Sequence, residues 1–121
     1  MNKRYVKFLI FASAVTLVVL LSAFSFTSMW KDPPIVPGPG VTEIRMLSEW
    51  LPQLAGTKSD TEVYVIKGSG DGGRFLLLGG THPNEPGATL AAVVMIENVS
   101  ALMGDLYVIP RANRSAFTHN D

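Results

Sequence analysis

The chain has 121 residues, which allows one ordinary domain at most. Ten lysines and arginines balance ten aspartates and glutamates, so the formal net charge is zero and nothing suggests the basic surface of a nucleic-acid-binding domain. We therefore expect no nucleic-acid partner. The sequence contains no cysteine, which excludes disulfides, thiolate metal ligands and a lipidated cysteine anchor.

The first 30 residues predict a membrane-spanning or signal helix. Three basic residues fall within the first seven positions, and no charged residue occurs from Phe8 to Trp30. About 20 apolar helical residues cross the hydrocarbon core of a bilayer. Ala23 and Ser25 also fit the small-x-small pattern of a signal-peptide cleavage site. An uncleaved anchor and cleavage after Ser25 therefore both remain open. Because basic residues stay on the cytoplasmic side, we expect the rest of the chain outside the cytoplasm, either membrane-anchored or exported into the periplasm.

A proline-rich segment follows this helix. Residues 31–41 are expected to be an extended linker, because proline fixes the backbone and lacks a hydrogen-bond donor. The predicted organisation is therefore an anchor or signal peptide over residues 1–30, a linker over 31–41 and one domain over 42–121.

The start of the domain shows helical spacing. Ile44, Leu47 and Trp50 recur at intervals of three residues. Thr42 is suited to cap a helix there, and Pro52 would end it near Trp50. We expect a short helix packed on the domain, in preference to one lying in the membrane interface.

Two strands with a glycine-rich connection are expected next. Residues 61–66 are rich in β-branched side chains, and residues 74–78 end in three leucines that suit a strand covered on both faces. The connection contains Gly68, Gly70 and Gly73 at the spacing of a dinucleotide-binding loop. Such a loop needs a helix directly after it, whereas a strand follows here. We therefore expect a β-hairpin turn.

A βαβ unit completes the predicted architecture. Residues 86–103 are long and apolar enough for a helix, with Pro86 in its first turn and Gly104 at its C-terminal end. Residues 105–109 are expected to be a strand parallel to the one before the helix. The predicted fold class is α/β: a hairpin and then a βαβ unit in a mixed sheet, preceded by the N-terminal helix.

The chain's His-x-x-Glu lies in the loop before this helix. His82 and Glu85 would stand at the carboxyl end of a parallel strand, where open α/β sheets bind their ligands. Imidazole nitrogen and carboxylate oxygen are good zinc ligands, and a tight turn can bring them to one point. The alternative is that Glu85 interacts with the helix N-terminus while His82 bonds locally. The position of His82 and Glu85 directly after the strand and its Gly-Gly favours the interpretation that they are metal ligands.

The turn GGTHPNEPG resembles the zinc-binding turn of the succinylglutamate desuccinylase/aspartoacylase family, which reads Gly-x-His-Gly-Asn-Glu. That family belongs to the zinc carboxypeptidase-like hydrolases. The segment VIPRANRSAF resembles the family's next strand and loop, and the likeness extends from Glu62 to Asp121. It implies that His82 and Glu85 are the first two ligands of one Zn²⁺ ion in a zinc-carboxypeptidase-like mixed sheet. Pro83 replaces a glycine that is common in the family, without removing a ligand.

The resemblance also implies that these residues are the front portion of a longer enzyme. The family's third zinc ligand is a histidine well downstream, and its general base is a glutamate further on, so we expect these 121 residues to be inactive by themselves. His119 is not expected to be a ligand. The family's carboxylate-binding Asn-Arg pair follows Asp-Leu, so that role is not assigned to Asn113 and Arg114, and Arg111 is expected to be a surface arginine.

Three functions remain as expectations. The first is a zinc-dependent amide or ester hydrolase whose complete form acts on an N-acyl amino acid or a related small molecule. The second is a peptidase or cell-wall amidase of the same fold, with a peptide-like substrate. The third is a non-catalytic, membrane-tethered protein that kept the turn and lost the rest of the site.

Overall fold

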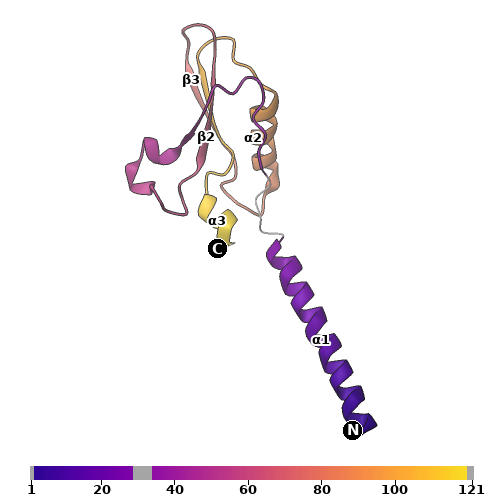
Figure 1. Cartoon of the computed structure of the whole chain (residues 1–121). Coiled ribbons are helices and arrows are strands. Elements are labelled where there is room, and N and C mark those ends of the chain that lie inside the picture. Colours follow the sequence, from indigo (N-terminus) through magenta and orange to yellow (C-terminus); the bar gives the residue numbers. More distant parts are fainter. Residues whose placement is uncertain (1, 29–33, 120–121) are drawn as a thin grey trace. The chain divides into compact units, whose positions relative to one another are not determined.

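The computed structural model describes residues 2–28 and 34–119 (Figure 1). The chain divides into two compact units after Lys31. The first contains a single helix, and the second contains a four-stranded sheet with two helices. The prediction of a mixed α/β architecture preceded by a long apolar helix is confirmed.

Helix α1, Lys3–Ser28, forms the N-terminal unit, and none of its residues is buried. It is the one candidate membrane span within the described residues, by length and composition, and a signal sequence would pass the same test. At 1.5 Å per residue its 26 residues measure about 39 Å, which exceeds a hydrocarbon core of ~30 Å. The predicted apolar stretch 8–30 therefore lies in α1 as far as Ser28, and residues 29 and 30 lie outside the described part.

The second unit is built on a mixed sheet with strand order β1-β2-β4-β3. Strand β2 is antiparallel to β1 and to β4, and β4 is parallel to β3. Helix α2 joins β3 to β4, so the predicted βαβ unit with two parallel strands is confirmed. The elements are β1 (Glu43–Met46), β2 (Glu62–Lys67), β3 (Arg74–Leu78), α2 (Pro86–Asn98), β4 (Asp105–Ile109) and α3 (Arg114–His119).

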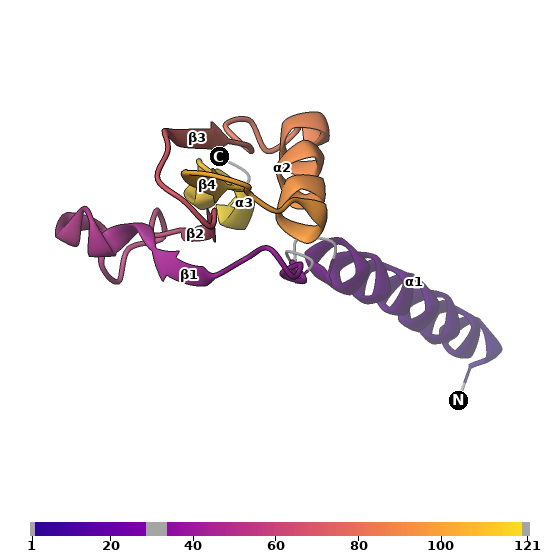
Figure 2. The same ribbon diagram turned by 90° about the horizontal axis from the view of Figure 1, so that it is seen from above.

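The predicted hairpin between β2 and β3 is wrong, because β4 lies between these strands (Figure 2). The glycine-rich connection instead runs along the segment that precedes β4. The Gly68 N–H donates to the Gly104 carbonyl at 2.7 Å, and the Gly104 N–H donates to the Gly70 carbonyl at 2.9 Å. A Cβ at Gly68 would lie 2.6 Å from the backbone nitrogen of Met103. Glycine is needed here because two backbones approach closely.

The helix predicted near Thr42 is also wrong. Residues 43–46 form β1, and two short 3₁₀ turns follow, Leu47–Glu49 and Pro52–Leu54. In β1, Ile44 pairs with Tyr64 of β2. The ladder of hydrogen bonds with β2 satisfies the backbone of these residues, and this tertiary pairing outweighs the helical spacing of a short segment.

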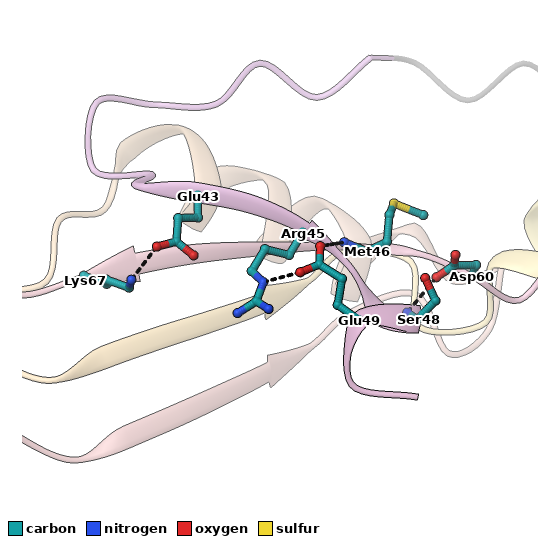
Figure 3. A network of polar contacts seen from close by, with 7 residues as sticks. All are labelled: Glu43, Arg45, Met46, Ser48, Glu49, Asp60 and Lys67. Carbon is teal, nitrogen blue, oxygen red and sulfur yellow. Dashed lines mark hydrogen bonds and ion pairs between the residues drawn. The ribbon is translucent and has the colours of Figure 1, made fainter. Parts of the chain in front are cut away.

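Polar contacts hold the chain where it leaves β1 (Figure 3). The Met46 N–H donates to Oε1 of Glu49 at 3.1 Å, and Arg45 Nε donates to Oε2 of the same carboxylate at 2.7 Å. The Ser48 N–H donates to Oδ1 of Asp60 at 2.9 Å. One carboxylate, that of Glu49, therefore binds both the start of the 3₁₀ turn and the strand before it.

Helix α2 covers one face of the sheet and ends earlier than predicted (Figure 2). Its last residue is Asn98, whose Nδ2 donates to the Val94 carbonyl at 3.0 Å, and Val99 is already extended. Gly104 was expected at the helix end, but it adopts a φ of +69° directly before β4. The core between helix and sheet consists of Tyr64, Ile66, Ala92, Ile96, Leu106 and Val108.

Strand β3 lies at the edge of the sheet, so the prediction that it is covered on both faces is wrong. Phe75, Leu76 and Leu78 are all more than half exposed, and only Leu77 packs against the core under α2. Beside this strand, an open groove of about 270 Å³ is lined by apolar residues that include Trp50 and Tyr107. The two edge strands of the sheet are β3 and β1.

The described part of the proline-rich segment contacts the domain. Ile35 and Val41 pack against the core cluster. The Gly38 N–H donates to the carbonyl of Ile96 in α2 at 3.1 Å, and a Cβ at Gly38 would collide with the carbonyl of Glu97. Residues 34–41 thus lie against α2, while residues 31–33 of the predicted linker lie outside the described part.

Candidate metal centre

The candidate site forms where the parallel strands β3 and β4 end at the same edge of the sheet. The loop after β3 begins at Gly79, and the loop after β4 begins at Pro110. Backbone hydrogen bonds join the two loops. The Gly79 N–H donates to the Ile109 carbonyl at 2.8 Å, the Ala112 N–H to the Gly79 carbonyl at 2.8 Å, and the Asn113 N–H to the Gly80 carbonyl at 3.1 Å.

Gly79 and Gly80, which precede the turn, are each required to be glycine for a different structural reason. A Cβ at Gly79 would lie 2.7 Å from the carbonyl oxygen of Ala88, so this residue allows α2 to pack closely on the end of β3. Gly80 has a φ of +67°, and a Cβ there would lie 2.6 Å from the carbonyl oxygen of Pro110. A side chain at either position would displace the loop that carries His82.

A tight turn brings the backbones of His82 and Glu85 together. The Glu85 N–H donates to the His82 carbonyl at 3.1 Å, with Pro83 and Asn84 inside the turn. Both candidate side chains are exposed. Neither forms a hydrogen bond or ion pair with another residue that the structure describes. The imidazole and the carboxylate therefore remain open to solvent on one turn.

Glu85 occupies the N-cap position of α2, but its side chain makes no capping hydrogen bond. Pro86, which has no N–H, takes the first helical position. The alternative for Glu85 was attraction between its carboxylate and the positive end of the helix dipole, which needs no hydrogen bond, and its position at the N-cap is compatible with that attraction.

The donor set fits part of a zinc site. Imidazole nitrogen and carboxylate oxygen are both zinc donors, and a catalytic zinc site uses three protein ligands and an open position. Among the residues that the structure describes, no three His, Cys, Asp or Glu side chains gather as a metal-binding group. His82 and Glu85 could hold one side of an ion, and a further donor would have to complete its coordination.

The remaining candidates lie near the same edge of the sheet or in α3. The expectation that Arg111 is a surface arginine is wrong: it is only 6% exposed, and its carbonyl accepts a hydrogen bond from Thr61 Oγ1 at 3.0 Å. Arg114 is partly buried at the start of α3. His119 ends α3, and its side chain lies outside the described part of the chain.

Sequence reasoning missed the side-chain contact of Asn113. Its Nδ2 donates to the carbonyl of Thr81 at 3.3 Å, directly beside His82. Its position was nevertheless predictable, because polar residues that follow neighbouring parallel strands meet at one edge of the sheet.

A buried tyrosine provides a test of the fold at this edge. Burial, and then the hydrogen bond that the Tyr64 hydroxyl donates to Oε2 of Glu62 at 3.0 Å, raise the pKa of Tyr64 from 10.0 to about 12. Its stabilising contribution is fully present below pH 10. It is lost between pH 10 and about 12, because the unfolded chain then releases this proton first.

We therefore expect the free energy of unfolding to fall between pH 10 and 12, and to fall less in a Tyr64→Phe variant. Denaturant titrations of both proteins at pH 9 and pH 11 would measure the difference. Equal losses in the two proteins would show that Tyr64 does not titrate in this way.

Comparison of the chain with models of known protein families, with curated protein sequences and with solved structures found no match in any of the three. The functional assignment therefore rests on the turn and its position in the fold.

Proposed function

We propose that this chain carries the first half of a zinc centre in a membrane-anchored or exported amide or ester hydrolase. The observation that carries the proposal is the pair His82 and Glu85, exposed on one tight turn at the carboxyl end of a parallel strand. Carboxylates and imidazoles in that position are well placed to bind a metal. The resemblance of GGTHPNEPG to a zinc-binding turn supports the same assignment.

The proposal assigns metal binding, and no catalytic step, to residues of this chain. When bound, zinc polarises a carbonyl group and makes water a better nucleophile at neutral pH. His82 and Glu85 would hold the ion, and the β4 loop fixes the backbone of Gly79 and Gly80, directly before the turn that carries them. A third ligand and a general base are expected beyond Asp121, so the proposal assigns no catalytic residue within these 121 residues.

The proposed location is the outer side of a membrane. Helix α1 is long enough to cross the bilayer, and the basic residues at its start favour a cytoplasmic N-terminus. We assign the complete protein an N-acyl amino acid or a related small amide or ester as substrate. A peptide-like substrate is the second candidate, favoured by the location outside the cytoplasm.

The test begins with the encoding DNA beyond the codon for Asp121, read for a downstream histidine and glutamate. The protein that this reading frame encodes would then be purified in detergent and offered N-acyl amino acids and short peptides. We expect hydrolysis that a chelator abolishes and added Zn²⁺ restores. Cleavage of peptides alone would favour the peptidase. An immediate stop codon, with no metal bound, would favour the non-catalytic alternative.

A further inference from the structure

We infer that Asn113 is a positioning residue for the metal-binding turn; this inference rests on the proposed role of His82. Asn113 lies in the loop after β4, more than thirty residues along the chain from His82. Its side-chain Nδ2 donates to the carbonyl oxygen of Thr81, the residue directly before His82, at 3.3 Å. The contact is therefore made from one loop to the backbone that carries the candidate ligand.

The orientation of the Asn113 amide follows from its two partners. A backbone carbonyl can only accept, so the amide nitrogen must face Thr81. The Ser115 hydroxyl donates to the amide oxygen, Oδ1, at 3.1 Å. This second contact holds the planar amide from its other side and directs its nitrogen towards the turn.

The hydrogen bond of the Asn113 side chain is not needed to hold the two loops together. Three backbone hydrogen bonds already join the loops, through Gly79, Gly80 and their partners, and an alanine at position 113 keeps the N–H that donates one of them. Only the bond from Nδ2 extends the connection to Thr81. We therefore assign the backbone bonds to stability and the Asn113 side chain to the direction in which His82 projects.

Hydrogen bonds that orient metal ligands typically change metal affinity by about 10–100-fold when they are lost. Asn113 holds the backbone beside His82, so we expect an effect at the lower end of that range. An Asn113→Ala variant removes the donor to the Thr81 carbonyl without adding a charge that could itself bind Zn²⁺. We expect Zn²⁺ to bind about 10-fold more weakly, with little change in the stability of the metal-free protein.

The chain offers a matched control. Asn98 makes the same kind of bond, from Nδ2 to the Val94 carbonyl at 3.0 Å, but at the far end of α2. An Asn98→Ala variant loses the same kind of hydrogen bond through the same substitution. We expect its Zn²⁺ affinity to stay within about twofold of the original, because it lies away from the turn.

The experiment uses the 121-residue chain with its anchor in detergent micelles. Zn²⁺ is titrated while the imidazole signals of His82 are followed by NMR, with His119 as the other histidine in the same spectrum. Backbone relaxation of His82 is measured without metal. We expect its order parameter to fall in Asn113→Ala from a rigid value of about 0.85 towards 0.6, and to stay unchanged in Asn98→Ala.

The outcomes separate the two proposals. If the original chain binds Zn²⁺ through His82 and Asn113→Ala binds it equally well, the positioning role is wrong and the proposed function stands. If Zn²⁺ does not reach His82 in the original chain or in the complete protein, the proposed function fails. Relaxation then still decides whether Asn113 holds the turn, since an unchanged order parameter in Asn113→Ala overturns that role.

Discussion

Replacing His82 with alanine is expected to abolish zinc binding by the complete protein and, with it, all hydrolysis. The imidazole is exposed, so its removal costs the fold little, and surface substitutions generally change stability by about 0.5 kcal/mol or less. The loss of a direct ligand should exceed the roughly 10–100-fold effect of losing an outer partner. Metal content after purification, measured as zinc per chain by atomic emission, gives the direct reading.

A second ligand variant separates metal binding from helix capping. Glu85→Gln keeps the shape of the side chain and removes the negative charge that makes a carboxylate a good zinc ligand, so zinc content should fall as it does in His82→Ala. Because Glu85 makes no capping hydrogen bond, helix α2 should lose only the attraction of a carboxylate to its N-terminus, about 0.3–1 kcal/mol. His119→Ala is the matched control for histidine loss and should retain its zinc. Normal zinc content in both turn variants would contradict the proposed site.

Replacing Gly80 with alanine is expected to lower the free energy of unfolding by about 2–5 kcal/mol. A left-handed backbone costs a residue with a Cβ about 1–2 kcal/mol, and forcing an atom into a filled space costs about 1–3 kcal/mol more. The φ of Gly80 is +67°, and the added Cβ would lie 2.6 Å from the Pro110 carbonyl oxygen and 3.0 Å from Cε2 of Phe117. Denaturant unfolding followed by tryptophan fluorescence measures the loss.

The matched control for this substitution should change stability in the opposite direction. Gly87 lies in the first turn of α2, has ordinary helical backbone and has no atom within 4 Å of the position that a Cβ would take. Gly87→Ala should therefore stabilise the protein by about 0.4–1 kcal/mol, because alanine reduces the freedom of the unfolded chain. Equal effects of the two substitutions would mean that the loops after β3 and β4 are not packed as described.

The local residue pattern was sufficient to predict several helices and strands. The β-branched residues of β2, the leucines of β3 and the apolar residues of β4 predicted three strands close to their actual bounds. The long apolar run after Pro86 predicted α2, and the uncharged apolar run that begins at Phe8 predicted α1. The turn that carries His82 and Glu85 was also expected, because it depends on glycine, proline and their order along a short stretch.

Prediction from local pattern failed where the structure depends on pairing between distant segments. Ile44, Leu47 and Trp50 have the spacing of a helix, yet residues 43–46 pair with β2 as a strand. The glycine-rich connection suggested a hairpin, yet β4 enters between β2 and β3. A four-residue segment has only a weak local preference for helix or strand, so pairing with a neighbouring strand that satisfies its backbone hydrogen bonds decides its structure. The local sequence does not show which strand that neighbour is.

The sequence by itself determined the long apolar N-terminal helix, the mixed α/β class, the βαβ unit and the position of the candidate ligands in one loop. Only the tertiary structure decided the strand order, the exposure of β3, the burial of Arg111 and the contact of Asn113 with the turn. The first group depends on periodicity, composition and turn residues within a few positions of one another. The second depends on residues such as Thr81 and Asn113, which lie far apart along the chain and meet only when β4 pairs with β3.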